Sequence, residues 1–527
     1  MQYIELFAGC GGLSLGLKSI GFNLVMANEL SPMASESYAF NFLNEDLYKE
    51  SESARPVFKK TLWLSSQFEK NNLKLRLREN PKKYPPIGQG ITDILGDGSN
   101  LNGGLVVGSI VDLNLLLQNN EVIRTNLKNG FGEGGLDLVS GGPPCQSFSM
   151  AGLRNKDCEK NSLPWEFVKF TQNIQPKVVL LENVTGILRP FKDNDGKKYF
   201  AWFELAKAFS SIGYIPLCLH VNAKYAGVPQ NRPRFLLIGI RSDYFDNISQ
   251  TFNDQEQELF REPLLFFKQT KNNKDIDINA LNYRDVSKLE DLLLFKASFL
   301  NPIVAFSDGV TTVSDAIDDL RSSRLKKNKF VIQLNQTFKT VLPKNIMRNH
   351  DYRKNSDLVQ RRFRLYQILQ QVNGTVYKEV LSIIKGESLM LSDNSWQILS
   401  KFNYLIETGD FAVFEKKAQF IDFIRRHATK KQTQKALIAD QPAPAALSIP
   451  DDACHYHQSE LRTLTVREMA RIQSFPDNFE FRSKVTTGGQ MRSFEVPQYT
   501  QVGNAVPPLL ARAVGLAIAD LLGRNII

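Results

Sequence analysis

The chain contains one cysteine whose surroundings favour exposure and reactivity. Cys145 stands in the motif Gly-Pro-Pro-Cys-Gln at 142–146, directly after the apolar run 136–140, whose length and composition predict a strand. Residues 147–149, Ser-Phe-Ser, can open a helix, and a helix N-terminus favours the thiolate form of a nearby cysteine. Two prolines hold the preceding backbone rigidly. We therefore interpret Cys145 as a nucleophile, because structural cysteines sit in apolar runs where the thiol is inert.

Three charged side chains are expected near this thiol. Glu182 ends the apolar segment 177–182, and ligands of open α/β sheets bind where the strands end at their carboxyl edge. Arg232 and Arg234 are two residues apart on an extended segment and therefore point to the same side. Beside a reactive thiol they favour recognition of an anion or a carbonyl group. The plainer alternatives are a surface glutamate after a strand and a structural salt bridge for one of the arginines.

A glycine-rich turn follows the first predicted strand. It reads Phe-Ala-Gly-Cys-Gly-Gly at 7–12, and its glycines allow a ligand to approach the backbone at the start of the next helix. The turn is neither G-x-G-x-x-G nor a Walker loop, which disfavours NAD and ATP. Glu29 ends the second predicted strand and can accept hydrogen bonds from ribose hydroxyls. Together they indicate an adenosine-type cofactor; the alternatives are a plain tight turn and a helix-capping glutamate.

The elements that position these residues alternate in the first 240 residues. Apolar segments of strand length occur at 3–7, 24–28, 105–110, 136–140, 177–182, 215–221 and 235–240. Helical patterns separate them, which predicts a largely parallel sheet with helices on both faces. Residues 45–104 are rich in Lys, Asn, Ser and Pro and exceed a normal crossover, so we interpret them as an insertion. The alternation is lost from 241 to about 461 and returns at 462–479 and 501–522.

Composition limits the class of protein. At 527 residues the chain exceeds one compact core, and a formal net charge of +10 suits a polyanionic partner. The five cysteines are scattered and form no C-x-x-C pair, so we expect no disulfide, no metal site and a reducing compartment. No apolar stretch reaches the about 18 residues needed to span a bilayer, and the first strand begins at once, so we expect no signal peptide and no membrane association.

These motifs resemble those of the C5-cytosine DNA methyltransferases. The segments that carry the resemblance, in the order seen in that family, are Phe-Ala-Gly-Cys-Gly-Gly at 7–12, Gly-Pro-Pro-Cys-Gln-Ser at 142–147, Glu-Asn-Val at 182–184, Gln-Asn-Arg-Pro-Arg at 230–234, the segment 462–477 and Gln-Val-Gly-Asn-Ala-Val-Pro-Pro at 501–508. The match covers roughly residues 1–44, 105–241 and 462–522. It implies a Rossmann-like S-adenosylmethionine-dependent methyltransferase sheet with a second, smaller target-recognition domain, in a bacterial modification enzyme.

The resemblance implies a role for each polar residue of the first site. Cys145 would add as a thiolate to C6 of cytosine, so that C5 becomes nucleophilic enough to take the methyl group. Glu182 would contact N3 and the exocyclic amine, and Arg234 would bind the O2 oxygen. Arg232 would assist, and Gln230 would position the segment.

The resemblance also implies the binding of S-adenosyl-L-methionine. The residues expected to line its site are Phe7, Gly9, Gly11, Glu29, Ile110, Pro144, Asn504 and Val506. A departure occurs beside Ile110, where many relatives have Gly-Asp-Ile and this chain has Gly-Ser-Ile at 108–110. Either Ser109 supplies the adenine contact less strongly, or Asp112 is recruited. The tail helix at about 508–522 is expected to pack back and complete the catalytic domain.

The family organisation implies two domains. We expect a catalytic domain of 1–241 plus 462–527, with the insertion at about 45–104, and a target-recognition DNA-binding domain of 242–461. Within the latter, residues 321–370 carry thirteen Lys and Arg against two Asp, a local net charge of +11. Most of these cations suit phosphates. The DNA-binding residues we select are Arg348, Arg353, Arg361 and Arg362. Eight basic residues of the insertion either add DNA contacts or simply cover the cofactor side: Lys59, Lys60, Lys70, Lys74, Arg76, Arg78, Lys82 and Lys83.

The expected substrate is duplex DNA, with the target cytosine flipped out of the helix. We expect a monomer in the bacterial cytoplasm, associated with the nucleoid through DNA, with a cognate restriction endonuclease only as a genetic partner. An RNA cytosine-5 methyltransferase of the same fold is one alternative, and the basic second domain argues against it. A non-catalytic DNA-binding regulator is the other, which the presence of Cys145, Glu182 and Arg234 together disfavours. The recognition sequence cannot be read from these residues.

Overall fold

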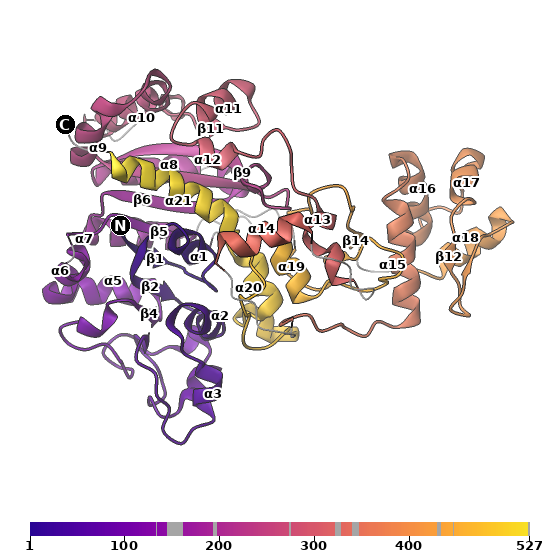
Figure 1. Cartoon of the computed structure of the whole chain (residues 1–527), viewed down its shortest axis with the longest axis horizontal. Coiled ribbons are helices and arrows are strands. Elements are labelled where there is room, and N and C mark those ends of the chain that lie inside the picture. Colours follow the sequence, from indigo (N-terminus) through magenta and orange to yellow (C-terminus); the bar gives the residue numbers. More distant parts are fainter. Residues whose placement is uncertain are drawn as a thin grey trace.

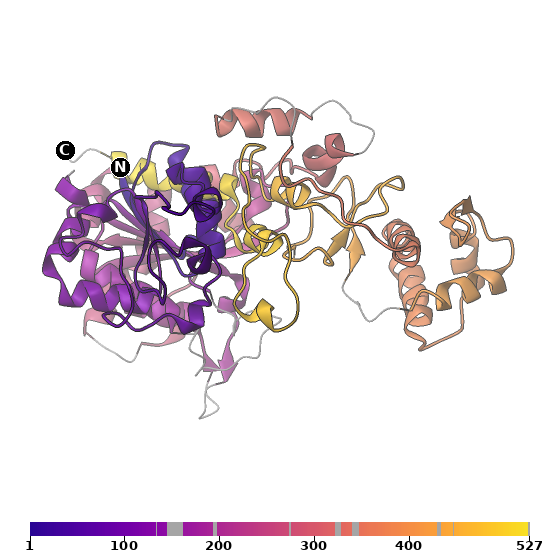
Figure 2. The same cartoon turned by 90° about the horizontal axis from the view of Figure 1, so that it is seen from below.

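The computed structural model describes residues 1–132, 134–144, 162–192, 198–272, 276–321, 328–339, 347–428, 434–445 and 447–524. A large α/β region, a middle region and a separate cluster of helices follow one another along the long axis of the molecule (Figure 1). Both termini lie in the α/β region, and the view from below places the helical cluster at the opposite end (Figure 2).

The α/β region is built on one nine-stranded sheet. Its strand order is β11-β9-β10-β6-β5-β1-β2-β4-β3, and only β10 runs antiparallel to its neighbours. The strands are β1 (Gln2–Leu6), β2 (Asn23–Glu29), β3 (Thr61–Trp63), β4 (Gly104–Val107), β5 (Leu138–Gly141), β6 (Val178–Val184), β9 (Tyr214–Asn222), β10 (Pro233–Arg241) and β11 (Arg284–Asp285). All seven predicted strands are confirmed. The short edge strands β3 and β11 were not predicted.

Helices cover both faces of this sheet because alternate strand residues point to opposite sides. Val179 and Leu181 of β6 belong to the core on one face, and Val178 and Leu180 belong to the core on the other. The helices that follow the strands are α1 (Gly12–Lys18), α2 (Pro32–Tyr38), α5 (Ile110–Asn119), α6 (Glu121–Lys128), α7 (Leu163–Ile174) and α8 (Ala201–Ser211). The predicted α/β fold class is therefore confirmed.

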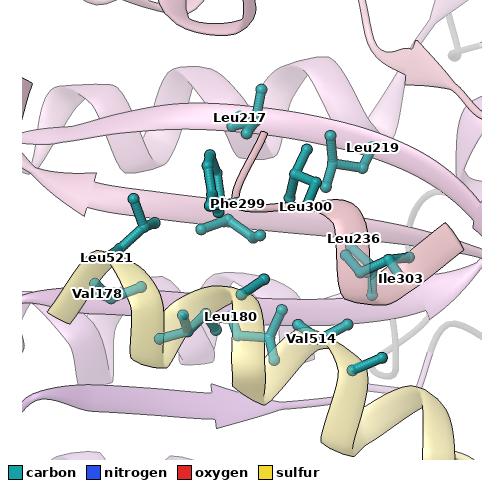
Figure 3. Close-up of a cluster of buried hydrophobic side chains, with 14 of the residues drawn as sticks. Val178, Leu180, Leu217, Leu219, Leu236, Phe299, Leu300, Ile303, Val514 and Leu521 are labelled. Carbon is teal, nitrogen blue, oxygen red and sulfur yellow. The ribbon is translucent and has the colours of Figure 1, made fainter. Parts of the chain in front are cut away.

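The C-terminal helix α21 (Pro508–Gly523) returns to this sheet, as predicted. Val514 and Leu521 of α21 pack beside Val178 and Leu180 of β6 (Figure 3). Gly16 of α1 faces this helix so closely that an added Cβ would lie 2.4 Å from the Ala511 Cβ atom. The last helix therefore completes the core that the first helix begins.

The predicted insertion contains ordered structure. It holds α3 (Leu47–Ser51), β3, α4 (Leu73–Arg76) and two 3-10 helices, η2 (Pro81–Lys83) and η3 (Ser99–Leu101). β3 pairs with β4 in parallel and extends the sheet by one strand. Arg76 Nη1 lies 2.6 Å from Asp93 Oδ2, and their side chains are 0% and 5% exposed. Because a buried pair is costly to separate, this contact fixes α4 to the later part of the insertion around residue 93.

The segment expected to form the second domain, 242–461, divides into two parts. Its first part forms α9 (Ser242–Ile248), α10 (Asp254–Asn272), β11, α11 (Leu289–Lys296) and α12 (Asn301–Val304). These elements pack on the large sheet: β11 pairs with β9, and Leu300 and Ile303 lie beside Leu219 and Leu236 (Figure 3). The elements from α9 to α12 therefore pack on the same sheet as the strands of residues 1–241, and the division of the chain into domains stays a prediction.

The second part forms the middle region and the helical cluster. In the middle, α13 (Val313–Ile317) and α14 (Lys329–Thr337) meet α19 (Val466–Ile472) and α20 (Gln498–Asn504) around a shared core. The cluster contains α15 (Asp357–Leu369), α16 (Gly374–Lys385), α17 (Asp393–Leu399) and α18 (Lys417–Arg425).

The two-stranded sheets are β7 (Phe191–Lys192) with β8 (Lys198–Tyr199), β12 (Tyr404–Leu405) with β13 (Phe411–Ala412), and β14 (Lys435–Ala436) with β15 (Ala453–Cys454).

No single helix among the described residues is long and apolar enough to cross a membrane. One pair of helical segments, Gly489–Asn504 and Pro508–Gly523, passes that test together on length and composition alone, with a bend of 66° between them.

Candidate active site at the carboxyl edge of the sheet

Glu182 and Arg234 form an ion pair at the edge where the parallel strands end. β10 is antiparallel to β6, so the start of β10 lies beside the end of β6, and Arg234 pairs in register with Val184. Arg234 Nε lies 2.6 Å from Glu182 Oε1, and the two side chains are 8% and 12% exposed. Burial lowers the pKa of the Arg234 guanidinium, and the Glu182 carboxylate partly offsets this effect. Both charges therefore lie close together at a position on the sheet edge that is almost fully buried from solvent.

The loop that leads to Cys145 lies directly over this pair. An added Cβ at Gly142 would come within 2.9 Å of Glu182 Oε2, so a larger residue there would displace the carboxylate. Asn183 Nδ2 donates a hydrogen bond of 3.0 Å to the Pro143 carbonyl oxygen. Pro144 is exposed at the end of this loop. Cys145 lies outside the described residues, so its role as nucleophile remains a prediction.

Arg232 and Gln230 hold backbone segments. Arg232 Nη2 donates to the carbonyl oxygens of Gly503 and Ala505, at 2.7 and 3.1 Å. Gln230 Nε2 donates to the Pro444 carbonyl oxygen at 2.9 Å. The buried Arg232 side chain thus joins β10 to the segment before α21. These contacts are compatible with the expected positioning role of Gln230, and the roles of both residues stay predictions.

The glycine-rich turn and Glu29 meet at the ends of β1 and β2. Gly9 N donates to Glu29 Oε2 at 2.8 Å, and Ser31 N donates to Glu29 Oε1 at 2.7 Å. Burial raises the pKa of the Glu29 carboxyl, and these backbone donors lower it. Each carboxylate oxygen accepts one of these backbone bonds and can accept another from a ligand. Gly9 has a φ of 56°, and an added Cβ would meet nothing within 4 Å, so this backbone is open to a ligand.

The C-terminal segment closes against the same turn. An added Cβ at Gly12 would lie 2.2 Å from the Val506 carbonyl oxygen, so only glycine allows this approach. Phe7 is half-buried and has a φ of 56°, in the left-handed region, and Asn504 is exposed. The open glycine, the ribose-type acceptor and the closing segment fit an adenosine-containing cofactor such as S-adenosyl-L-methionine.

The start of α5 supplies the other predicted cofactor contact. Ile110 is buried in the core beneath the sheet edge. The Ser109 hydroxyl accepts a hydrogen bond from Val111 N at 3.2 Å and caps the helix. Asp112 is half-buried, and this burial raises the pKa of its carboxyl. Ser109 therefore caps α5, and Asp112 is the acidic residue in the first turn of that helix.

A polar network beneath the glycine-rich turn was not predicted. Ser14 donates a short hydrogen bond to Glu5, and the Tyr3 hydroxyl donates to Ser14 Oγ at 2.9 Å. The hydroxyl of Tyr38 lies 2.8 Å from the same oxygen. Burial raises the pKa of Glu5 to about 8. The signal in the sequence was a glutamate inside the apolar run of the first strand, where a charge needs a partner.

The segment 462–477 is held by buried ion pairs. Arg462 forms a bidentate pair with Glu468, at 2.8 and 2.7 Å, and these contacts lower the pKa of that carboxyl to about 2 despite its burial. Glu468 also caps its own helix with Thr465, in a reciprocal capping box. Arg471 lies 2.5 Å from Asp319 and 2.7 Å from Asp477. The Arg471–Asp319 pair therefore ties α19 to the 3-10 helix η10 (Asp318–Leu320) that follows α13.

The predicted DNA-binding arginines differ in their surroundings. Arg348 and Arg353 are exposed, and Arg348 Nε lies 3.9 Å from Glu480 Oε2. Arg361 is half-buried. Arg362 Nε donates to the His427 carbonyl oxygen at 3.1 Å, and its Nη2 donates to Ala428, just beyond α18. Arg362 therefore stabilises the packing of α15 on α18, which leaves Arg348 and Arg353 as the better candidates for phosphate contact.

The sheet topology, the glycine-rich turn with its acidic partner and the polar pair at the strand ends are typical of an α/β methyltransferase. Comparison with known protein families identifies the particular class of methyltransferase. The model of the C-5 cytosine-specific DNA methylase family matches residues 1–60 and 116–520. The chain therefore belongs to the C-5 cytosine-specific DNA methylase family, and it is an enzyme that methylates cytosine in DNA at carbon 5.

Curated relatives match this chain over almost all of its length. The type II methyltransferase M.DdeI of Desulfomicrobium norvegicum is 25% identical over 521 residues, which are 98% of this chain and 88% of that protein. The type II methyltransferase M1.HphI of Haemophilus parahaemolyticus is 24% identical over 529 residues, with 99% and 87% covered. Among solved structures, the Dnmt2 methyltransferase of S. pombe aligns with a TM-score of 0.37 and 14% identity, over 99% of this chain and 98% of that one.

Proposed function

We propose that the Glu182–Arg234 pair forms the cytosine-binding part of the active site, and that Cys145 attacks the bound base. The pair carries this proposal because it places a carboxylate and a guanidinium 2.6 Å apart at one dry edge, beside the loop that leads to the thiol. Such a pair matches one edge of cytosine, where O2 accepts hydrogen bonds, the exocyclic amine donates them and N3 lies between. The target base must leave the duplex to reach this edge.

Each residue then has a defined task. The Cys145 thiolate forms a bond to C6. The electron pair of the C5–C6 double bond shifts toward C5 and the conjugated ring atoms, so that C5 becomes nucleophilic. Arg234 donates hydrogen bonds to O2, where negative charge builds up. Glu182 accepts a hydrogen bond from the exocyclic amine and shares a proton with N3. Once C5 has taken the methyl group, with cleavage of the bond between that methyl and the sulfonium of its donor, loss of the C5 proton to a base would restore the double bond and release the thiolate, so that Cys145 is regenerated.

The residues at the ends of β1, β2 and β4 would hold S-adenosyl-L-methionine. When bound, it supplies an electrophilic methyl group. Glu29 would accept hydrogen bonds from the ribose, and Phe7, Gly9 and Gly11 would line the open turn. Ile110, Pro144, Asn504 and Val506 would complete the site, with Arg232 holding the segment that contains the last two.

The biological role follows from the relatives. Since both curated relatives described above are type II methyltransferases, we propose that this enzyme methylates one specific duplex sequence and protects host DNA in a restriction-modification system. The cognate endonuclease would be a genetic partner that requires no contact with this chain. A monomer in the bacterial cytoplasm suits such an enzyme.

A two-substrate assay tests the proposal. The protein is incubated with methyl-labelled S-adenosyl-L-methionine and with either duplex DNA or transfer RNA. Label on DNA that bisulfite sequencing locates at one repeated motif supports it, and label on RNA alone overturns it. Cys145→Ser should bind DNA normally but transfer no methyl group; turnover by this variant would exclude Cys145 as the nucleophile.

A further inference from the structure

The insertion at 45–104 reaches the edge of the sheet at which the cofactor is proposed to bind. We propose that its segment 84–87, Tyr-Pro-Pro-Ile, forms the outer wall of the adenosine site, with Tyr84 as a contact residue for the cofactor. This inference rests on the proposed binding of S-adenosyl-L-methionine. It assigns a function to a part of the chain that lies mostly outside the family match, since residues 61–115 are not matched.

One end of this segment lies over the end of β2. The Tyr84 hydroxyl donates a hydrogen bond of 3.3 Å to the carbonyl oxygen of Leu30, the residue after Glu29. The phenol is close enough to the Glu29 carboxylate for that charge to contribute to its raised pKa, behind the larger effects of burial and Glu79. The side chain of Leu30 is itself exposed, at 44%. Tyr84 is thus the aromatic side chain beside the predicted ribose acceptor.

The other end of the segment lies over the start of α5. The Ile87 backbone N–H is close enough to the Asp112 carboxylate to lower its pKa against the larger effect of burial, and the Ile87 side chain packs against the core cluster that contains Ile110. The segment therefore runs from the end of β2 to the start of α5. An adenosine that contacts Glu29 through its ribose and Ile110 through its base would then lie against this segment.

The wall is held rigidly. Ser66 Oγ donates to Glu79 Oε2 at 2.7 Å, and Gln67 N donates to Glu79 Oε1 at 2.8 Å. The buried Arg76–Asp93 pair joins α4 to the strand-like return after the segment. Two prolines at 85 and 86 fix their own φ angles, which leaves few backbone conformations to lose when a ligand binds. An ordered aromatic wall of this kind can stack on a base without a large entropic cost.

The charges of the insertion favour a covering role over DNA contact. Of the eight basic residues that the sequence analysis named in it, five have partners within the protein: Lys60 donates to the Asn102 carbonyl oxygen, Lys70 lies over Phe58, Lys74 pairs with Glu52, Arg76 pairs with Asp93 and Arg78 pairs with Glu36. Cations held in this way are less available to phosphates. Between the two alternatives raised by the sequence, these contacts support the cover over the cofactor side.

Calorimetric titration with S-adenosylhomocysteine tests the wall on the full-length protein. Tyr84→Ala should weaken binding by about tenfold, because stacking of an aromatic side chain on a base has an effect of this order. Tyr84→Phe should stay within about threefold of wild type, since it keeps the ring. The same loss should occur with 5′-methylthioadenosine, which lacks the amino-acid part. Lys82→Ala, two residues away and exposed, is the matched control.

The outcomes separate the wall from the proposed function. Wild-type affinity in Tyr84→Ala overturns the wall. If that variant does not fold, Ile87→Ser decides in its place: weaker binding of both adenosine ligands supports the wall, and unchanged binding overturns it. A wild-type protein that binds neither ligand would contradict the proposed cofactor instead. The melting temperature without ligand checks that each variant is folded, and the ligand-induced rise in melting temperature must fall along with the affinity.

Discussion

Asn183 Nδ2 donates a hydrogen bond of 3.0 Å to the carbonyl oxygen of Pro143, and this bond joins the end of β6 to the loop that precedes Cys145. Asn183 also accepts a bond from Val184 N through its own Oδ1, at 2.9 Å. One side chain thus fixes both the strand that carries Glu182 and the loop that presents the thiol. Asn183 is therefore a positioning residue.

Asn183→Asp tests this role because it removes the donor and keeps the acceptor for Val184. We expect kcat to fall by about tenfold to a hundredfold, since a small misplacement of a nucleophile is costly. Binding of S-adenosylhomocysteine and of DNA should not change. Single-turnover kinetics and titrations measure the two separately. A variant with normal kcat would show that the loop is held by other contacts.

The Glu182–Arg234 pair should be coupled in both stability and catalysis. Arg234→Ala leaves a buried carboxylate without its partner, which we expect to destabilise the protein by about 3 kcal/mol in urea unfolding. Glu182→Gln in the same chain should recover part of that loss, because the neutral amide needs no counter-charge. Methyl transfer should stay low in all three variants. Additive stability effects in the double-mutant cycle would contradict a direct pair.

Arg232, the residue before β10, offers a contrast with Arg234 on that strand. Its guanidinium holds the carbonyl oxygens of Gly503 and Ala505, so Arg232→Met should loosen the segment that closes over the glycine-rich turn. We expect weaker binding of S-adenosylhomocysteine, by about fivefold to tenfold, with little change in affinity for DNA. Titration with each ligand checks this. If methyl transfer falls while cofactor binding is unchanged, Arg232 contacts cytosine directly instead of holding the C-terminal segment.

The fold followed closely from the sequence because its signals are local. Apolar runs mark the seven predicted strands, and Glu182 and Arg234 could be placed together since both stand at strand ends on one edge. The contacts of Arg232 could not be predicted in this way, because its partners, Gly503 and Ala505, lie about 270 residues further along the chain. Strand β3 was missed for another reason: three residues inside a polar insertion carry no period, and only pairing with β4 makes them a strand.

The Glu5 network predicts a pH dependence of stability. The pKa of Glu5 is raised to about 8 in the folded protein, above its usual value of about 4.5, so folding favours the protonated form. Its contribution to stability is complete below about pH 4.5 and is lost as the pH rises toward 8, with a slope of up to about 1.4 kcal/mol per pH unit. Glu5→Gln should remove this slope between pH 5 and 8 in urea unfolding. An identical slope in the variant would contradict the burial of an ionisable group.

Salt dependence distinguishes the arginines that contact phosphates from those that hold the helical cluster. Arg353→Ala should weaken binding to DNA of any sequence and reduce the slope of log affinity against log salt by about one, because one fewer counterion is released. Arg362→Ala is the matched control, since that side chain donates to the carbonyl oxygens of His427 and Ala428. It should lower the melting temperature and leave the salt slope unchanged. If the slope falls in Arg362→Ala instead, the guanidinium serves DNA as well as the packing of α15 on α18.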